Sequence, residues 1–466
     1  MSRSRTWVAL GALTLLSISC GPGAQGPPIG QASLTPAPTL GTPAPPSPSI
    51  SAEWTEYHGG VSRSGLGPET PGLSSPAVAW KAAVDGAVYA SPLIVGGHVI
   101  VATESNSVYA LDLFTGSIVW SVNLGSPVDA STLPCGDIGP VTGITGTPAA
   151  EPSTGRLFVV AFLRSHHHML FDLSLANGSV VAQQDVDPPG SNPAVEQQRG
   201  ALSVASGYVY IPFGGLYGDC GPYHGYLEAV PIGFGTTLLY RVPSARGAGI
   251  WSPSGASIDS AGNVYVITGN GASQSTFDYS NSVIELAYDL QSVRSYFAPA
   301  NWAALNAGDT DLGSVGATLL PSQGAVLAIG KEGVAYRLRA DNLGGVGGQT
   351  GSARVCSGAL GGTAWSGTLA YVPCSDGLYA LSIGASGVSV AWHASHPSLG
   401  SPIVAAGAVW AIEPGTATLF ALDPASGSLL YSLALGAAEH FSTPAATEGF
   451  VVSPAGTNVV AVSTAG

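Results

Sequence analysis

The chain has 466 residues, only 9% of them charged, and its formal net charge at pH 7 is −14. So acidic a protein repels phosphate backbones and anionic lipid headgroups. This charge argues against nucleic-acid binding and against electrostatic docking on a membrane. Glycine (64 residues) and proline (35 residues) are abundant, as expected of many short strands joined by tight turns. The composition therefore predicts an all-β protein.

Residues 1–20 predict an export signal. Arg3 and Arg5 precede an apolar run, residues 7–16, that is too short to span a bilayer as a permanent helix. The run ends near Cys20, in a setting that resembles a bacterial lipoprotein processing site. We expect lipidation at Cys20, with ordinary secretory cleavage as the alternative. The expected location is the outer face of the bacterial cytoplasmic membrane or the periplasm.

Residues 21–50 are rich in proline, serine, threonine and glycine and cannot bury a core. We expect a disordered linker there and a single folded domain over residues 51–466. A closed ring of repeats can hold a chain of this length in one domain. The domain is expected to be monomeric.

A short sequence pattern, here called the phrase, recurs along this domain. The segment SPLIV at 91–95 is followed by YALD at 109–112, and SPIVA at 401–405 is followed by FALD at 420–423. Each phrase continues into an Asp-x-x-Thr/Ser-Gly turn and a large aromatic residue. The apolar alternation and the Gly turns predict hairpins, and four strands per unit are typical of a propeller blade.

The repeat predicts an all-β, eight-bladed β-propeller of four-stranded antiparallel blades. The innermost strands are expected to begin near Ser91, Thr147, Gly200, Ser254, Val315, Gly362, Ser401 and Thr443. The last of these starts leaves room before the C-terminus for only two strands. We therefore expect the missing outer strands of this blade to come from residues 54–81, which would close the ring.

The phrase resembles the quinoprotein-type β-propeller repeat, named after enzymes that bind pyrroloquinoline quinone (PQQ), and the resemblance extends over residues 54–464. It implies two classes of function. The first is a non-catalytic binding or scaffolding module without a cofactor, like the propeller lipoprotein of the outer-membrane β-barrel assembly machinery. Its partner would be an envelope protein, a peptide or a glycan. The second is a PQQ- and calcium-dependent alcohol or sugar dehydrogenase.

For a dehydrogenase, the resemblance implies Ca²⁺ bound by oxygen ligands, an Asp base, an aromatic floor and often a roof of two adjacent, bonded cysteines. The sequence contains no adjacent cysteines. Acids, amides and an aromatic ring converging on a cavity wide enough for a tricyclic quinone would favour the dehydrogenase. A central funnel of the propeller that is lined by glycine, alanine and valine would favour the scaffold.

Four residues are candidates for the funnel because they depart from the repeat beside an expected innermost strand: Arg199, Trp251, Asp309 and Asp311. Arg199 could instead pair with a carboxylate between blades, and Trp251 could fill the core between them. The two aspartates could ligate Ca²⁺ or merely cap a turn. No residue is assigned a catalytic role.

Four cysteines follow Cys20, and an exported compartment permits disulfides. Cys356 and Cys374 flank a predicted strand and turn, so neighbouring strands could bring them within bonding distance. Cys135 and Cys220 then form the second candidate pair by default.

The triplet His166-His167-His168 invites a metal interpretation. In an extended strand, His166 and His168 would share one side and could contribute to a Zn²⁺ or Cu²⁺ site. Because no full ligand set is visible nearby, we favour a structural strand with polar surface residues.

Overall fold

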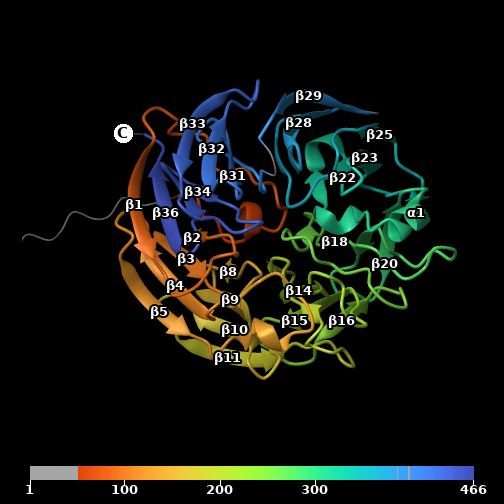
Figure 1. Cartoon of the computed structure of the whole chain (residues 1–466), viewed down its shortest axis with the longest axis horizontal. Coiled ribbons are helices and arrows are strands. Elements are labelled where there is room, and N and C mark those ends of the chain that lie inside the picture. Colours follow the sequence, from red (N-terminus) through yellow and green to blue (C-terminus); the bar gives the residue numbers. More distant parts are fainter. Residues whose placement is uncertain (1–50, 386, 397–398, 466) are drawn as a thin grey trace, which may run out of the picture. The chain divides into compact units, whose positions relative to one another are not determined.

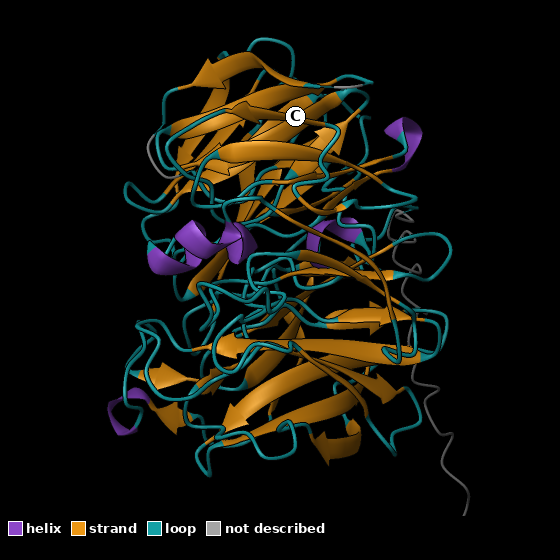
Figure 2. Cartoon of the chain, turned by 90° about the vertical axis from the view of Figure 1, so that its right-hand side faces the viewer, coloured by secondary structure: helices purple, strands orange, loops and turns teal. Residues whose placement is uncertain are grey.

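The structure is a computed structural model that describes residues 51–385, 387–396 and 399–465. The expected export signal, Cys20 and the linker lie outside these residues. The described residues belong to one compact unit built mainly of strands, and Figure 2 shows how short its helical segments are. Within the described part, no helix is long and apolar enough to cross a membrane.

Eight antiparallel sheets surround a centre, as Figure 1 shows, and the prediction of an eight-bladed β-propeller is confirmed. From the innermost strand outward, blades 1 to 4 are β2 (Leu93–Val95), β3 (His98–Ala102), β4 (Ser107–Asp112), β5 (Ile118–Asn123); β8 (Ala149–Glu151), β9 (Arg156–Leu163), β10 (His167–Ser174), β11 (Val180–Asp185); β13 (Ser203–Ala205), β14 (Tyr208–Gly215), β15 (Tyr226–Pro231), β16 (Leu238–Arg241); and β17 (Ser257–Ile258), β18 (Val264–Ile267), β19 (Val283–Leu286), β20 (Val293–Ala298). Blades 5 to 8 are β21 (Thr318–Leu320), β22 (Ala325–Ala328), β23 (Val334–Arg339), β25 (Gly351–Arg354); β26 (Ala364–Ser366), β27 (Leu369–Cys374), β28 (Gly377–Ile383), β29 (Val388–Ala394); β30 (Ile403–Ala405), β31 (Ala408–Glu413), β32 (Thr418–Leu422), β33 (Leu429–Ala434); and β34 (Ala445–Thr447), β35 (Phe450–Pro454), β36 (Asn458–Ser463), β1 (Ala77–Ala83).

A few short elements decorate the blades. The strand β12 (Glu196–Gln197) pairs with β14, and β24 (Gly345–Val346) joins β20 in parallel. The remaining elements are the hairpin β6 (Val128–Asp129) and β7 (Val141–Thr142), α1 (Trp302–Ala307), and the 3₁₀ turns η1 (Tyr57–Gly59), η2 (Ala130–Thr132), η3 (Leu312–Ser314) and η4 (Pro321–Gln323). These additions lie in the connections, where a site can be built without disturbing the blades.

The aromatic residue that closes the repeat joins neighbouring blades. Trp120 on the outer strand β5 packs on Gly178 in the turn of the next blade, where an added Cβ would lie 2.5 Å from the indole. The indole N–H of Trp120 donates to the carbonyl oxygen of Leu175 at 3.1 Å. Trp80 on Gly116 and Trp392 on Gly427 repeat this contact. Because these three glycines also have φ near +70°, no other residue meets both requirements.

The ring closes through the two ends of the domain, but the strand count of the last blade differs from the prediction. β1 pairs with β36, so the N-terminal part supplies one outer strand. The C-terminal part supplies three strands rather than two, because tight turns join β34 to β35 and β35 to β36. The closed ring leaves no blade without its outer strand.

Residues 54–66, here called the entry segment, run across the inner ends of the blades before the first strand begins. Its backbone is bonded to blades 1, 2, 4, 6 and 7 through Trp54 with Ile94, Thr55 with Ala150, Val61 with Ile258, Ser64 with Trp365, and Gly65 with Val404. Tyr57 also lies 3.4 Å from the Thr443 hydroxyl, just ahead of blade 8. The entry segment therefore ties most of the ring together.

Arg63 is the central anchor of this segment and is only 2% exposed. Its guanidinium donates to the carbonyl oxygens of Leu202 at 2.7 Å and Ala256 at 3.1 Å, in blades 3 and 4. It also pairs with the buried carboxylate of Glu56 at 3.0 Å. A buried charge is tolerated only when it is paired and its donors are used, and Arg63 meets both conditions.

We expect Arg63→Met to lower the free energy of unfolding by about 3–5 kcal/mol, because it leaves the Glu56 carboxylate buried without its partner. Chemical denaturation of the purified protein measures this change. The matched control is Arg339→Met, which removes an exposed ion pair with Asp341 and should change stability little. Equal losses in the two variants would contradict the anchoring role.

Candidate functional site

A cavity of about 510 Å³ is lined by connections from several blades. Residues from blades so far apart in the sequence can meet only near the centre of the ring, so we call this cavity the funnel. Its principal polar and aromatic lining residues are Asp137, Arg199, Asp219, Tyr223, Trp251, Asp309, Asp311, Lys331, His440 and Phe441. A volume of this size suits a small molecule.

All four residues singled out from the sequence line this cavity: Arg199, Trp251, Asp309 and Asp311. Each lies in the connection that leads from one blade to the innermost strand of the next. In an antiparallel meander, this connection and the turn between the second and third strands lie on the same side of the blade. That turn supplies Tyr223 in blade 3 and Lys331 in blade 5, which completes the wall.

Trp251 presents a large aromatic surface to the funnel and is held in place by glycines. An added Cβ at Gly214 would lie 2.9 Å from the Trp251 Cβ, and one at Gly269 would lie 2.9 Å from its Nε1. The ring of Phe441 meets it edge-on, with 6.5 Å between centroids. Because Trp251 is only half-buried, its indole is available to a ligand.

The buried Asp311 and the half-buried Lys331 form an ion pair in the funnel wall, with 2.5 Å between the carboxylate and the ammonium. The backbone N–H of Asn270 donates to the other oxygen of Asp311 at 2.7 Å. Burial raises the pKa of Asp311, and Lys331 opposes that shift. Burial works to lower the pKa of Lys331, but the neighbouring carboxylates of Asp311 and Asp309 outweigh it, so that pKa is raised. The ammonium therefore stays charged at neutral pH.

Asp309 has a different environment, because its side chain is 71% exposed. The Asn270 amide donates to it at 2.8 Å, and the Lys331 ammonium lies 3.4 Å away. The carboxylate of Asp311 is therefore already paired with Lys331, whereas the carboxylate of Asp309 is accessible to a ligand.

Arg199 also lines the funnel. It donates to Asp137 at 3.3 Å, and its guanidinium carbon lies 5.5 Å from the ring centroid of Phe441. His440 approaches the other oxygen of Asp137 at 3.3 Å. Burial lowers the pKa of Arg199 and of His440 from their ordinary values. Arg199 thus lines the funnel and is also paired with a carboxylate, because its partner Asp137 lines the funnel too.

A second, small cavity of about 10 Å³ shares Arg199 and Phe441 with the funnel and also touches Tyr57 of the entry segment. Close to this small cavity, Glu104 accepts hydrogen bonds from the Gly143 N–H at 2.6 Å and the Thr145 hydroxyl at 2.8 Å. Burial raises the pKa of Glu104 to about 7. The entry segment thus lines a small cavity beside the funnel.

Sequence reasoning missed Lys331, Asp137, Tyr223, His440 and Phe441. One signal was available, because Lys331 is one of only two lysines in the chain, the other being Lys81. The other four residues lie in connections without a recognisable motif, and only the ring brings them together.

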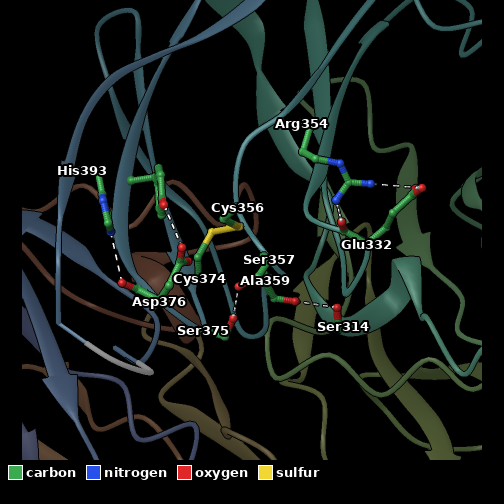
Figure 3. Close-up of a disulfide and its surroundings, with 11 residues drawn as sticks. Ser314, Glu332, Arg354, Cys356, Ser357, Ala359, Cys374, Ser375, Asp376 and His393 are labelled. Carbon is green, nitrogen blue, oxygen red and sulfur yellow. Dashed lines mark hydrogen bonds and ion pairs between the residues drawn. A yellow bond between two sulfur atoms is a disulfide. The ribbon is translucent and has the colours of Figure 1, made fainter.

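Two disulfides join the four cysteines of the domain, Cys135 to Cys220 and Cys356 to Cys374. The second, shown in Figure 3, links the end of blade 5 to β27 of blade 6. Cys374 and Cys356 also lie near Asp376, but their sulfurs are bonded to each other rather than free as thiolates.

The bond between Cys135 and Cys220 bears on the funnel directly. It links the loop that carries Asp137 to the loop that carries Asp219, and both aspartates line the cavity. We call these two loops, residues 130–140 and 216–224, the rim. The disulfide fixes the rim although its two halves are far apart in the sequence.

Comparison with known proteins bears on the fold. A family model described as outer membrane protein assembly factor BamB matches residues 73–214. This match covers β1, blades 1 and 2 and the beginning of blade 3, and the same blade unit recurs around the ring. Residues 73–214 therefore resemble a PQQ-type β-propeller repeat family, and this match spans less than a third of the chain.

Several solved structures share the architecture at low identity. Quinohemoprotein alcohol dehydrogenase from Pseudomonas putida HK5 has a TM-score of 0.73 and 13% identity, covering 89% of this chain and 80% of that chain. The enzyme of the same name from Comamonas testosteroni has a TM-score of 0.70 and 16% identity, covering 90% and 81%. BamB from Moraxella catarrhalis has a TM-score of 0.58 and 11% identity, covering 83% and 99%. No curated protein matches this chain. These identities establish a shared fold.

We expect the double variant Cys135→Ser/Cys220→Ser to loosen the rim of this propeller and leave the blades folded. Amide hydrogen exchange should accelerate in residues 130–140 and 216–224 and stay slow in the inner strands. The control, Cys356→Ser/Cys374→Ser, removes the link between blades 5 and 6 and should leave exchange at the rim unchanged. Unaltered exchange at the rim in the first variant would contradict this role.

Proposed function

We propose that this protein is an exported, lipid-anchored binding module of the bacterial cell envelope whose funnel holds a small, hydroxyl-rich molecule such as a sugar or polyol. The observation that carries the proposal is the convergence of Trp251, Asp309, Arg199 and Lys331 on one cavity of about 510 Å³. Wide cavities with an aromatic wall and a few placed polar groups are typical of small-molecule sites. A funnel lined only by glycine, alanine and valine, which would favour a plain scaffold, is not what these residues form.

The charge pattern supports a neutral ligand. Lys331 is paired with Asp311, and Arg199 with Asp137, so each cation already faces a carboxylate. Such pairs leave hydrogen-bond donors and acceptors side by side without a strong excess of positive charge. Vicinal hydroxyls, which both donate and accept, match this arrangement, and the apolar face of a sugar ring matches the indole of Trp251.

We expect purified protein to bind at least one member of a panel of monosaccharides, disaccharides and alditols in calorimetric titrations. Trp251→Ala should weaken that binding at least about tenfold, because it removes the stacking surface. The control is Tyr288→Ala, which removes an aromatic ring that is 47% exposed and absent from the funnel lining. Absence of binding across the panel, or an equal loss in both variants, would refute the sugar site.

A second candidate is a PQQ-dependent alcohol or sugar dehydrogenase, favoured by the aromatic and acidic residues that meet in the funnel. The residues fit an organic quinone in part: Trp251 offers a ring face, but the cations Arg199 and Lys331 are already paired with Asp137 and Asp311. They fit Ca²⁺ poorly, because Asp311 and Asp137 are already paired with cations. Bound quinone supplies two-electron oxidation of an alcohol, and the accessible Asp309 is the carboxylate placed to accept the hydroxyl proton.

Titration with PQQ, with and without Ca²⁺, followed by dye reduction with alcohols and aldoses, separates the two candidates. Sugar binding without any spectral change of added PQQ supports the binding module. Dye reduction that requires PQQ supports the dehydrogenase. No spectral change and no dye reduction would remove the second candidate.

The lipid anchor is a separate part of the proposal and rests on the sequence around Cys20. We expect Cys20→Ala to release the protein from the membrane fraction, because stable anchoring needs acyl chains that the variant cannot receive. Fractionation of cells that express the wild type and the variant measures this. Continued membrane retention of Cys20→Ala would refute the anchor.

A further inference from the structure

A second group of metal-ligating side chains lies on blade 2, outside the residues that line the funnel. The histidine triplet does not lie as a continuous strand would place it, because His166 occupies a turn with φ of +57° and β10 begins at His167. The antiparallel register pairs Met169 with Asp185, so His167 faces Asp187, just beyond the end of β11. His167 therefore meets both carboxylates, whereas His168 contacts only Asp187.

The distances within this group suit a single cation. Nδ1 of His167 lies 2.8 Å from Oδ2 of Asp187 and 2.9 Å from Oδ2 of Asp185. The three ligand atoms all lie within 4.8 Å of one another. Two ligands bound to one tetrahedral Zn²⁺ ion, each about 2.1 Å from it, are themselves about 3.4 Å apart. The observed spacings are those of hydrogen bonds, so the three side chains need to move apart only by a few tenths of an ångström to receive an ion.

Asp187 is positioned by a buried neighbour. Its other oxygen, Oδ1, lies 2.8 Å from Nδ1 of His168 and accepts the backbone N–H of the same residue at 3.1 Å. The His168 ring is stacked on Phe162, with 4.1 Å between centroids and 4° between planes. A ligand carboxylate that is itself held by a hydrogen bond is the usual support of a metal site. His168 is therefore a positioning residue for Asp187.

Two buried carboxyl groups of blade 3 are sensitive to the charge of Asp187. Among the described residues, Oε2 of Glu196 and Oε2 of Glu228 have no hydrogen-bond partner, and both side chains are buried. Burial raises the pKa of each group to about 8, and the charge of Asp187 adds to the shift. Both groups are therefore mostly protonated at neutral pH, and a cation held by Asp187 would favour their ionised form.

We propose that His167, Asp185 and Asp187 bind a divalent transition-metal ion of the Zn²⁺ class, with water completing its coordination. One imidazole with two carboxylates suits such borderline ions. The side chains of His167 and Asp185 are 51% and 50% exposed, so the ion reaches the site from solvent. The net charge of −14 also favours cations near the surface. The site is independent of the funnel and of any ligand bound there.

The test is a calorimetric titration of ZnCl₂ into the purified full chain, made without a polyhistidine tag and freed of metal with a chelator. We expect one Zn²⁺ per chain and affinity at least about tenfold weaker in His167→Ala. The control is His98→Ala, which removes a partly exposed histidine of blade 1 and should bind as the wild type does. Wild-type affinity no higher than that of His167→Ala would overturn the site.

A spectroscopic measurement covers the case in which a variant is poorly folded. With Cu²⁺ as the probe, the electron paramagnetic resonance spectrum should show coupling to one nitrogen in the wild type and none in His167→Ala. Asp185→Asn, which alters a half-exposed ligand, should weaken Zn²⁺ binding as well. A spectrum without nitrogen coupling, or Zn²⁺ binding unchanged in Asp185→Asn, would indicate a non-specific acidic patch and overturn the proposal.

Discussion

The buried guanidinium of Arg63 is the interaction on which the rest of the propeller depends. It bonds to carbonyl oxygens in blades 3 and 4 and to Glu56 within the entry segment. Each blade otherwise contacts mainly its neighbours, so stability in such a ring is a sum of local interfaces. A segment that crosses the blades makes the ring behave as one unit. It also places Tyr57 in the small cavity that shares Arg199 and Phe441 with the funnel.

The fold could be predicted from the sequence because its determinants are local and repeated. Apolar alternation, Gly turns and a closing aromatic define each blade, and the packing of Trp120 on Gly178 shows why the phrase has these residues. The observed innermost strands begin two or three residues after the expected starts. The strand count of the last blade was wrong because the estimate from the residues left after Thr443 allowed too much chain for its turns. Register and turn length in β34 to β36 decide that count.

The candidate site was predictable only in part. Arg199, Trp251, Asp309 and Asp311 depart from the repeat beside innermost strands, and that position leads to the funnel. Lys331 comes from the turn between the second and third strands of its blade, a place where any polar residue would look like ordinary surface. Its role depends on Asp311, which lies in a different connection. Pairing across blades has no signature in a single sequence, because the ring alone sets these distances.

The charge pairs of the funnel separate this protein from what its architecture alone suggests. Dehydrogenases and BamB share the ring with it at identities of 16% or less, so the shared blades carry no information about ligands. In this chain Lys331 and Arg199 neutralise Asp311 and Asp137, which otherwise could serve as ligands for a hard cation. A Ca²⁺ ion in the funnel would have to displace these cations from buried or half-buried positions. Hydrogen bonding to a neutral molecule leaves both ion pairs intact, so it costs less free energy than binding Ca²⁺ through the same residues.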